Sequence, residues 1–424
     1  MNPTRPARGV LGLPEFRALA LAGLFSAAGD QLARVALSVL VYQRTSSPLL
    51  TALTYALTFL PAVVSGPLLS GLADRRPRRT LMVTADLIRA LLVSAMAVPG
   101  LPLTALLSLL VAVNVLEAPF DTARAALMPD VTGDRYLAAL VVDQTVQQSA
   151  QVLGFAGSGL LLLVFSPTTA LLIDAASFLA SAVLLRRRVT HRPAVAEHGR
   201  NALDRGRARR ALTDAKLGLT TIWSDLPVRR AVLLTWLVSA CAITPEGLAA
   251  PYAQQLSGGS VLVALLLTAN PIGNVLSGLT AARWSQDHSD PPLAPLALLV
   301  VVPLALCALN PTAPIVLSLI VLSGAGMTVS LLARTVFVAH VPEHARGRAF
   351  AIAGTGIIVG QGLAVALAGA AASTLSPSTV IGAFGLVGFA ATLLLLATTR
   401  RHRPTNTSPA SPPGGRPTSD TPDW

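Results

Sequence analysis

The chain has 424 residues, of which 53% are hydrophobic and only 12% are charged, and its mean hydropathy is +0.63. This composition leaves too little polar surface for a soluble globular protein and indicates a polytopic membrane protein. The formal net charge of +12 would also fit a nucleic-acid-binding protein. The basic residues, however, lie between apolar segments rather than in a soluble domain, so we expect no nucleic-acid partner.

Twelve apolar segments have the roughly 17 to 25 residues that a membrane-spanning helix needs. They predict helices at residues 17–42, 50–72, 80–98, 103–122, 137–165 and 168–185, and then at 231–254, 261–282, 293–309, 314–336, 349–372 and 379–397. We therefore expect an all-α membrane protein with twelve transmembrane helices. Residues 1–185 should form an N-terminal six-helix bundle and residues 231–397 a C-terminal one.

Two further segments lie outside these bundles. Residues 186–230 contain the stretch LTDAKLGLTTIWSDLPVRR, in which Leu212, Leu219, Ile222 and Trp223 share one helical face. We expect a cytoplasmic linker with an amphipathic helix that rests on anionic lipid, and a calmodulin-like peptide role is the alternative. Residues 398–424 are rich in Pro, Ser, Thr and Gly, which predicts a disordered tail.

The basic residues are concentrated on one side of the predicted helices. If the N-terminus is cytoplasmic, the cytoplasmic segments hold 29 of the 32 Lys and Arg residues, and the external loops hold only Arg44. The remaining two, Arg34 and Arg89, lie inside helices. Because Lys and Arg favour cytoplasmic loops, we predict a multi-pass protein of the plasma membrane with both termini in the cytoplasm.

The two halves of the chain show a weak internal repeat. Shifts of 207 and 210 residues align several positions: Gly66 with Gly273, Gly71 with Gly278, Arg124 with Arg334, and Val131 with Val341. Apolar sequences produce chance matches, yet the pattern agrees with a parallel duplication of a six-helix unit. The second copy lacks one acid of the first, because Asp74 aligns with Ala281.

The segment GLADRRPRR, residues 71–79, combines a glycine, an acid and four arginines where a long apolar run ends. Glycine lets a neighbouring helix approach, and an acid can interact with that helix's positive N-terminus. The segment resembles the G-x-L-A-D-R-x-G-R-R loop between helices 2 and 3 of major facilitator superfamily transporters, with Pro77 in place of the second glycine. The resemblance implies a gating role, in which Asp74 contacts the start of helix 11 in the outward-open state. The gating residues of this loop are Gly71, Asp74, Arg75, Arg78 and Arg79.

Other motifs resemble the macrolide-efflux and enterobactin-exporter branch of that superfamily. The first helix has its G-D element at Asp30, an R-x-A-L-x-P motif begins at Arg124, and a V-P-x-x-x-R-G-R motif begins at Val341. The resemblance adds Arg124, Arg346, Gly347 and Arg348 to the gating loops. Substrates of that branch are small amphipathic molecules, namely antibiotics, siderophores and, in one subgroup, lysophospholipids. Phe155 replaces the proline of the G-P-x-x-G-G element that many antiporters carry in helix 5, which weakens the case for antiport.

Ionisable residues inside a bilayer cost about 2.5 to 3.5 kcal/mol each at mid-helix, so each needs a partner or a function. The predicted helices contain eight of interest: Asp30, Arg34, Asp86, Arg89, Glu117, Asp143, Asp174 and Glu246. Asp30 and Arg34 are four residues apart and close enough to neutralise one another. We expect Asp86 and Arg89 to form a structural pair in a peripheral helix, and Asp174 to lie near the outer interface.

The family's central cavity is lined by helices 1, 4, 7 and 10, which would place Asp30, Glu117 and Glu246 there, with Asn114 on the face of Glu117. Glu117 has no basic residue one turn away and is the better proton carrier. Alternatively, Glu117 lies near enough to the cytoplasmic end to stay ionised and carries no proton. Asp30, held ionised by Arg34, would be a fixed charge for a cationic substrate. We expect Glu246 to be hydrated.

Three glutamines and an asparagine complete the candidate site. Gln144, Gln148 and Gln151 form a polar stripe in helix 5, which should face either the cavity or another helix. Asn270 precedes Pro271 in helix 8 and could contact a ligand or bond to the backbone that the proline leaves unpaired.

The sequence contains no nucleophile with a base, no phosphate-binding loop and no metal cluster, and Cys241 and Cys307 lack disulfide or zinc spacing. We expect a protein without enzymatic activity, cofactor or metal. The function most consistent with these features is a monomeric, proton-coupled secondary transporter that exports drugs, antibiotics or siderophores by alternating access, as in antiporters of multidrug resistance. The alternatives are a lysophospholipid flippase of the same fold and a non-transporting membrane sensor.

Overall fold

A computed structural model describes residues 9–61, 65, 76–192, 213, 216–284 and 293–400. Three predicted gating residues, Gly71, Asp74 and Arg75, lie outside the described residues, as do most of the linker and the tail beyond residue 400. Within the described ranges the chain forms helices and short connections, without β-strands.

The helices of the first bundle follow the predicted order. They are α2 (Pro14–Thr45), α3 (Pro48–Ala56), α6 (Arg78–Met96), α7 (Leu103–Val115), α8 (Glu117–Thr132), the 3-10 helix η1 (Gly133–Arg135), α9 (Tyr136–Val164) and α10 (Pro167–Arg188). Helices α7 and α8 together form one pass. This pass runs ten residues beyond the predicted end at 122, because Arg124 and Pro129 end the apolar pattern but not the helix.

The second bundle repeats this arrangement. It contains α12 (Leu226–Ala242), α13 (Thr244–Gly247), α14 (Ala249–Gln255), α15 (Ser260–Trp284), α16 (Leu293–Leu306), the 3-10 helix η2 (Cys307–Leu309), α17 (Ala313–Gly326), α18 (Thr328–His340), α19 (Glu343–Ala371) and α20 (Pro377–Arg400). Helices α12 to α14 form one interrupted pass, and α17 and α18 form another. The predicted all-α fold with twelve passes is confirmed.

Eight passes in the described residues are long and apolar enough to cross a membrane by length and composition alone. Each of the other four has an identifiable reason to differ. Parts of residues 62–75, which follow α3, are not described, α16 is short, and charged residues or glutamines interrupt the apolar sequences of α6 and α9.

Local sequence sets where several helices begin. The side chains of Ser47, Ser166 and Asp225 each accept a hydrogen bond from the backbone N–H three residues later. A proline follows each cap at the first or second helical position, where its missing N–H costs nothing. These caps fix the starts of α3, α10 and α12.

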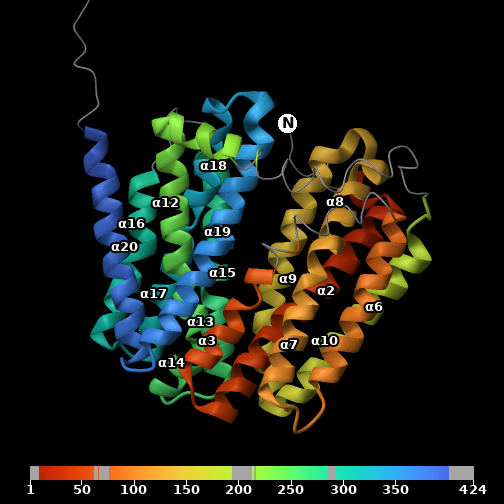
Figure 1. The fold of residues 1–424 in the computed structure, drawn as a ribbon, viewed down its shortest axis with the longest axis horizontal. Coiled ribbons are helices and arrows are strands. Elements are labelled where there is room, and N and C mark those ends of the chain that lie inside the picture. The colour runs from red at the N-terminus through yellow and green to blue at the C-terminus, as the bar shows by residue number, and fades with distance from the viewer. Residues whose placement is uncertain are drawn as a thin grey trace, which may run out of the picture.

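The two bundles lie side by side, with α9 and α15 between them and α3 next to the second bundle (Figure 1). We call the end of the molecule that holds residues 76–79, 186–192, 226–230 and 340–348 the arginine-rich end. The opposite end holds residues 45–48, 97–102, 165–167, 255–260 and 372–377.

The bundles are joined toward the opposite end. A Cβ on Gly369 of α19 would collide with Ala52 of α3, and a Cβ on Gly159 of α9 would lie 2.7 Å from the Cβ of Ala264 in α15. Small residues at these positions allow helices of different bundles to pack closely. The Ser260 hydroxyl adds a hydrogen bond to the Leu162 carbonyl at 3.3 Å.

Candidate functional site

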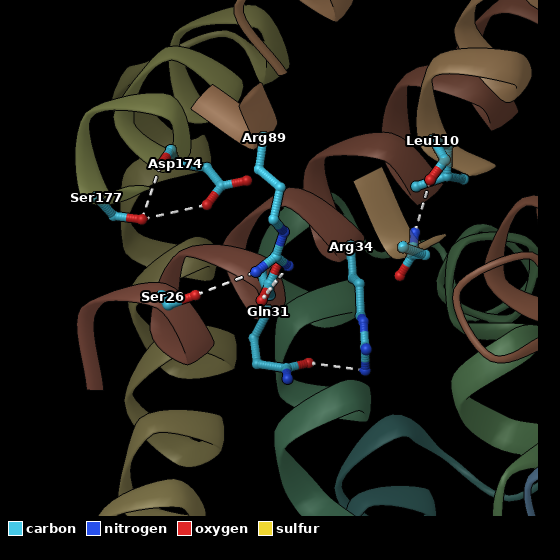
Figure 2. Close-up of polar contacts among 9 residues, drawn as sticks. Ser26, Gln31, Arg34, Arg89, Leu110, Asp174 and Ser177 are labelled. Atoms are coloured by element: carbon cyan, nitrogen blue, oxygen red, sulfur yellow. Dashed lines mark hydrogen bonds and ion pairs between the residues drawn. The ribbon is translucent and has the colours of Figure 1, made fainter. Parts of the chain in front are cut away.

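The centre of the first bundle is built around Arg89 of α6, whose side chain is 1% exposed. Its guanidinium donates to both carboxylate oxygens of Asp30 in α2, at 2.9 and 3.0 Å, and to the Ser26 hydroxyl at 3.4 Å (Figure 2). The guanidinium also lies 4.2 Å from the centre of the Phe178 ring of α10. A two-point ion pair with a cation–π contact holds this charge in a fixed position.

Two more carboxylates are buried beside this pair. Asp174 of α10 is 1% exposed and accepts a 3.3 Å hydrogen bond from Ser177, while its second oxygen has no partner in the described residues (Figure 2). Asp86 of α6 is fully buried and accepts from Ser181 at 2.6 Å, again with one oxygen unpaired there. Buried carboxylates with incomplete hydrogen bonding are costly while they remain ionised.

Helix α8 contributes two acids one helical turn apart. Glu117 is half-buried and makes no side-chain hydrogen bond within the described residues, whereas Asp121 is exposed. Glu117 interacts electrostatically with both Asp30 and Asp121, and with the positive charges of Arg89 and Arg34. One turn further along, Arg124 is 5% exposed and forms an ion pair with Asp143 of α9.

These groups form one connected set that we call the acid cluster. Its members are the carboxylates Asp30, Asp86, Glu117, Asp121, Asp143 and Asp174 and the arginines Arg34, Arg89 and Arg124. If every member were ionised, the cluster would contain three more negative charges than positive ones. The acid cluster therefore holds an excess of acid that its own three arginines do not neutralise.

The predicted pairing of Asp30 with Arg34 is wrong, and Asp86 interacts with Arg89 electrostatically without forming an ion pair in the described residues. Arg34 donates instead to the Gln31 side chain at 3.3 Å and lies 5.4 Å from the Phe59 ring centre (Figure 2). Asp30 pairs with Arg89 of another helix rather than with Arg34 of its own helix, because α6 directs Arg89 into the bundle. The prediction that α6 is a peripheral helix did not anticipate a charged side chain directed into the bundle.

The expected hydration of Asp174 and Glu246 is also wrong. Asp174 is buried beside Arg89, as described above. Glu246 lies in α13, is 6% exposed, and accepts a 2.5 Å hydrogen bond from the hydroxyl of Tyr55 in α3. This bond joins the two bundles, because α3 packs on the second bundle and covers the carboxylate. Nothing in the sequence pattern around Tyr55 singled it out.

The amide side chains of the predicted site have different surroundings. Asn114 is buried but donates to the Leu110 carbonyl of its own helix at 2.8 Å, so its donor is already used (Figure 2). Asn270 is 8% exposed, and its amide nitrogen has no partner in the described residues. In the glutamine stripe of α9, Gln144 is exposed, and Gln148 and Gln151 are half-buried.

The described gating residues mainly fasten helix ends at the arginine-rich end. Arg78 pairs with Asp130 and donates to the Ala126 carbonyl, and Arg79 donates to the Arg186 carbonyl at 2.6 Å. Arg346 donates to the Val338 and Val341 carbonyls at the end of α18, both at 3.0 Å. Gly347 and Arg348 are exposed in the first turns of α19, and Arg124 belongs to the acid cluster rather than to a loop.

Part of the predicted linker helix is described, at residues 216–224. Ile222 is fully buried in a cluster with Val228, Val232 and Phe337 of the second bundle. Trp223 lies 6.3 Å from Trp236 of α12, centre to centre. The helix is thus docked on the second bundle by one face.

Comparison with known proteins identifies the family. The family model for the Major Facilitator Superfamily matches residues 19–245 and 247–421. An uncharacterized MFS-type transporter, YfiS, of Bacillus subtilis (strain 168) is 29% identical over 220 residues. That match covers 51% of this chain and 50% of YfiS, so the chain spans about half the length of the curated relative it matches.

Solved transporter structures share the fold at low sequence identity. A POT family transporter in complex with a thioalcohol-conjugated peptide superimposes with a TM-score of 0.72 at 11% identity, covering 91% of this chain and 96% of that one. A bacterial homologue of the human lysosomal transporter Spinster, in an inward-facing and occupied conformation, gives 0.69 at 14% identity, covering 92% and 98%. The nucleoside transporter NupG gives 0.70 at 12% identity, covering 92% and 100%. With the family model matched along nearly the whole sequence, the chain belongs to the Major Facilitator Superfamily.

Proposed function

We propose that this protein is a proton-coupled secondary transporter that exports small amphipathic molecules by alternating access. The observation that carries the proposal is the acid cluster, in which acids outnumber arginines by three inside the first bundle of a superfamily member. Burial makes that excess unfavourable unless protons or another cation neutralise it. The motifs similar to the macrolide-efflux branch support export as the direction.

Glu117 is the proton carrier in this mechanism. It is half-buried, forms no hydrogen bond within the described residues, and interacts with both the Asp30–Arg89 pair and Arg34. A proton on Glu117 removes a negative charge beside Arg89 and so strengthens the pair of Arg89 with Asp30. Loss of that proton lets Glu117 compete for Arg89, which changes the contacts between α8, α2 and α6.

The contact between Tyr55 and Glu246 is proposed as the latch of the closed opposite end. If the arginine-rich end is cytoplasmic, as its basic residues favour, the bundles are joined toward the outside and the conformation is inward-facing. Alternating access then requires the Tyr55–Glu246 bond to break when the outer side opens. We also propose that the protein lies in the plasma membrane with both termini in the cytoplasm. We further propose that it acts as a monomeric carrier rather than an enzyme.

Reconstituted protein tests this proposal. Proteoliposomes loaded with the neutral dye N-phenyl-1-naphthylamine or its sulfonated analogue 1-anilinonaphthalene-8-sulfonate should release at least one of them faster when a pH gradient is imposed. Glu117→Gln should retain dye exchange but lose the response to the gradient. Asp134→Asn, at an exposed acid of η1, is the matched control and should behave like wild type.

Two outcomes would contradict the proposal. If wild type moves neither dye under any gradient, a transport role for these amphipathic molecules fails, and a non-transporting sensor gains support. If Glu117→Gln responds to the gradient as wild type does, Glu117 is not the proton carrier.

A further inference from the structure

A cavity of about 500 Å³ lies in the second bundle toward the arginine-rich end. Helices α12, α18 and α19 enclose it, and three aromatic side chains line it, namely Trp236, Phe337 and Phe350. The Phe337 and Phe350 rings are in contact, with centres 4.3 Å apart. This volume is within the range of about 300 to 1,000 Å³ that is usual for small-molecule sites.

The cavity has one charged lining residue, Arg334 of α18, and no acid lines it. Arg334 is exposed, and its guanidinium forms no ion pair or hydrogen bond within the described parts of the chain. The Ser330 hydroxyl, one turn away on the same helix and also lining the cavity, is buried without a partner there. An apolar chamber thus presents a positive charge and an unused hydroxyl donor.

The internal repeat explains why Arg334 is unpaired. Its counterpart in the first bundle is Arg124, which is buried and ion-paired with Asp143 of α9. Shifts of 207 and 210 residues place Phe350 and Ala353 of α19 at the position of that acid. Both residues line the cavity and neither is charged. The second bundle has therefore kept the arginine but lost the acid, and an aromatic cavity occupies that place.

We propose that this aromatic cavity binds an amphipathic organic anion. The aromatic or apolar body of the ligand packs among Trp236, Phe337 and Phe350, and its carboxylate, sulfonate or phosphate group binds Arg334. The Ser330 hydroxyl donates a further hydrogen bond to the acid group. Guanidinium suits this role because its planar donors match the oxygens of such acids.

The inference rests on the proposed transport function and names its substrate class. The sequence favoured a cationic substrate because Asp30 was expected to offer a fixed negative charge. In the structure Asp30 is instead engaged by Arg89 at two points. The free charge that faces an apolar chamber is positive, so the ligand should be negative.

Two dyes with the same aromatic skeleton test the charge preference in purified protein, without any gradient. 1-Anilinonaphthalene-8-sulfonate carries an acid group that N-phenyl-1-naphthylamine lacks. The reporter is the fluorescence of Trp236 in a variant whose other three tryptophans, Trp223, Trp284 and Trp424, are replaced by Phe. Quenching of this single tryptophan by each dye then reports occupancy of the cavity rather than dye in detergent.

Arg334→Gln should weaken binding of the sulfonate by about tenfold or more, as expected for loss of a charge-assisted hydrogen bond, and leave the neutral dye unchanged. Gly354→Leu should weaken binding of both dyes. A Cβ at Gly354 points into the cavity without meeting any atom within 4 Å, so the leucine fills ligand space. Gly360→Leu is the control, because its unobstructed Cβ lies in a neighbouring pocket that Trp236 also lines. Unchanged quenching in this variant assigns the quenching to the cavity that contains Arg334.

Equal affinity of wild type for the two dyes, or sulfonate binding that is insensitive to Arg334→Gln, would overturn the anion site. Such a result would leave proton-driven transport intact if vesicles still export the neutral dye. Conversely, Arg334-dependent binding with no flux in vesicles would support the anion site and refute transport. The two ideas can therefore fail separately.

Discussion

Replacing Asp30 by Asn should destabilise the protein much more than replacing Arg34 by Gln. Asp30 accepts two bonds from Arg89, whose side chain is 1% exposed. Removing one partner of a buried ion pair costs about 3 to 5 kcal/mol, and within the described residues Arg89 keeps only longer-range interactions with the other acids of the cluster. At about 2 to 4 °C per kcal/mol for a unit of bundle size, Tm should fall by about 6 to 20 °C.

The comparison with Arg34 makes this prediction specific. Arg34 contacts the Gln31 side chain and the Phe59 ring and interacts with Tyr55 and Glu246, but it forms no ion pair within the described residues. Arg34→Gln should therefore cost only about 1 to 2 kcal/mol. Thermal unfolding of purified protein in detergent, followed by circular dichroism, measures both losses. The double variant Asp30→Asn/Arg89→Gln removes both charges and should recover part of the stability, which gives a non-zero coupling energy. Equal losses for Asp30→Asn and Arg34→Gln, together with additive effects in the double variant, would refute the assigned pair.

Three further predictions concern the interface, the packing and the orientation. Tyr55→Phe removes a hydrogen bond to a buried carboxylate, worth about 1.5 to 3 kcal/mol, and should raise the population that is open at the opposite end about tenfold or more. Distances between labels on α3 and α14 measure this population, and unchanged distances would exclude a latch. Gly154→Leu should lower stability in thermal unfolding by about 1 to 3 kcal/mol, because a Cβ there lies 2.5 Å from the Ala28 carbonyl oxygen. Gly157→Ala should not lower stability, because the space around its Cβ is open. Equal stability of the two variants would contradict the close packing of α2 and α9. In a variant lacking Cys241 and Cys307, a cysteine at Gly258 should react with an impermeant thiol reagent from outside the cell and one at Arg187 only from inside; the reverse pattern would invert the proposed orientation.

The fold was predictable because it depends on the number, length and charge flanks of apolar segments. All twelve predicted helices have counterparts, and most of their boundaries differ by a few residues. The larger differences occur where polar residues continue a helix, as at Arg124 in α8, or where a cap lies before the apolar run, as at Asp225 before α12. Hydropathy indicates which residues cross the bilayer, but it does not indicate where the hydrogen bonds of a helix end.

The candidate site was less predictable because its partners come from different helices. Spacing of four residues in one helix favoured Asp30 with Arg34, yet Arg89, 59 residues away, provides the better geometry. Asp121 lies inside the helix predicted at residues 103–122 and was still missed, although its spacing from Glu117 and Arg124 places all three on one helical face. The contact between Tyr55 and Glu246 joins residues 191 positions apart, which a single sequence does not reveal.

The most direct test of proton-coupled transport is the movement of protons driven by substrate alone. Proteoliposomes that contain a trapped pH indicator, with equal pH on both sides, receive 1-anilinonaphthalene-8-sulfonate or N-phenyl-1-naphthylamine on one side. We expect a change in internal pH that accompanies dye flux in wild type, is lost in Glu117→Gln, and persists in Asp134→Asn. Dye flux in wild type without any change in internal pH would contradict proton-coupled transport.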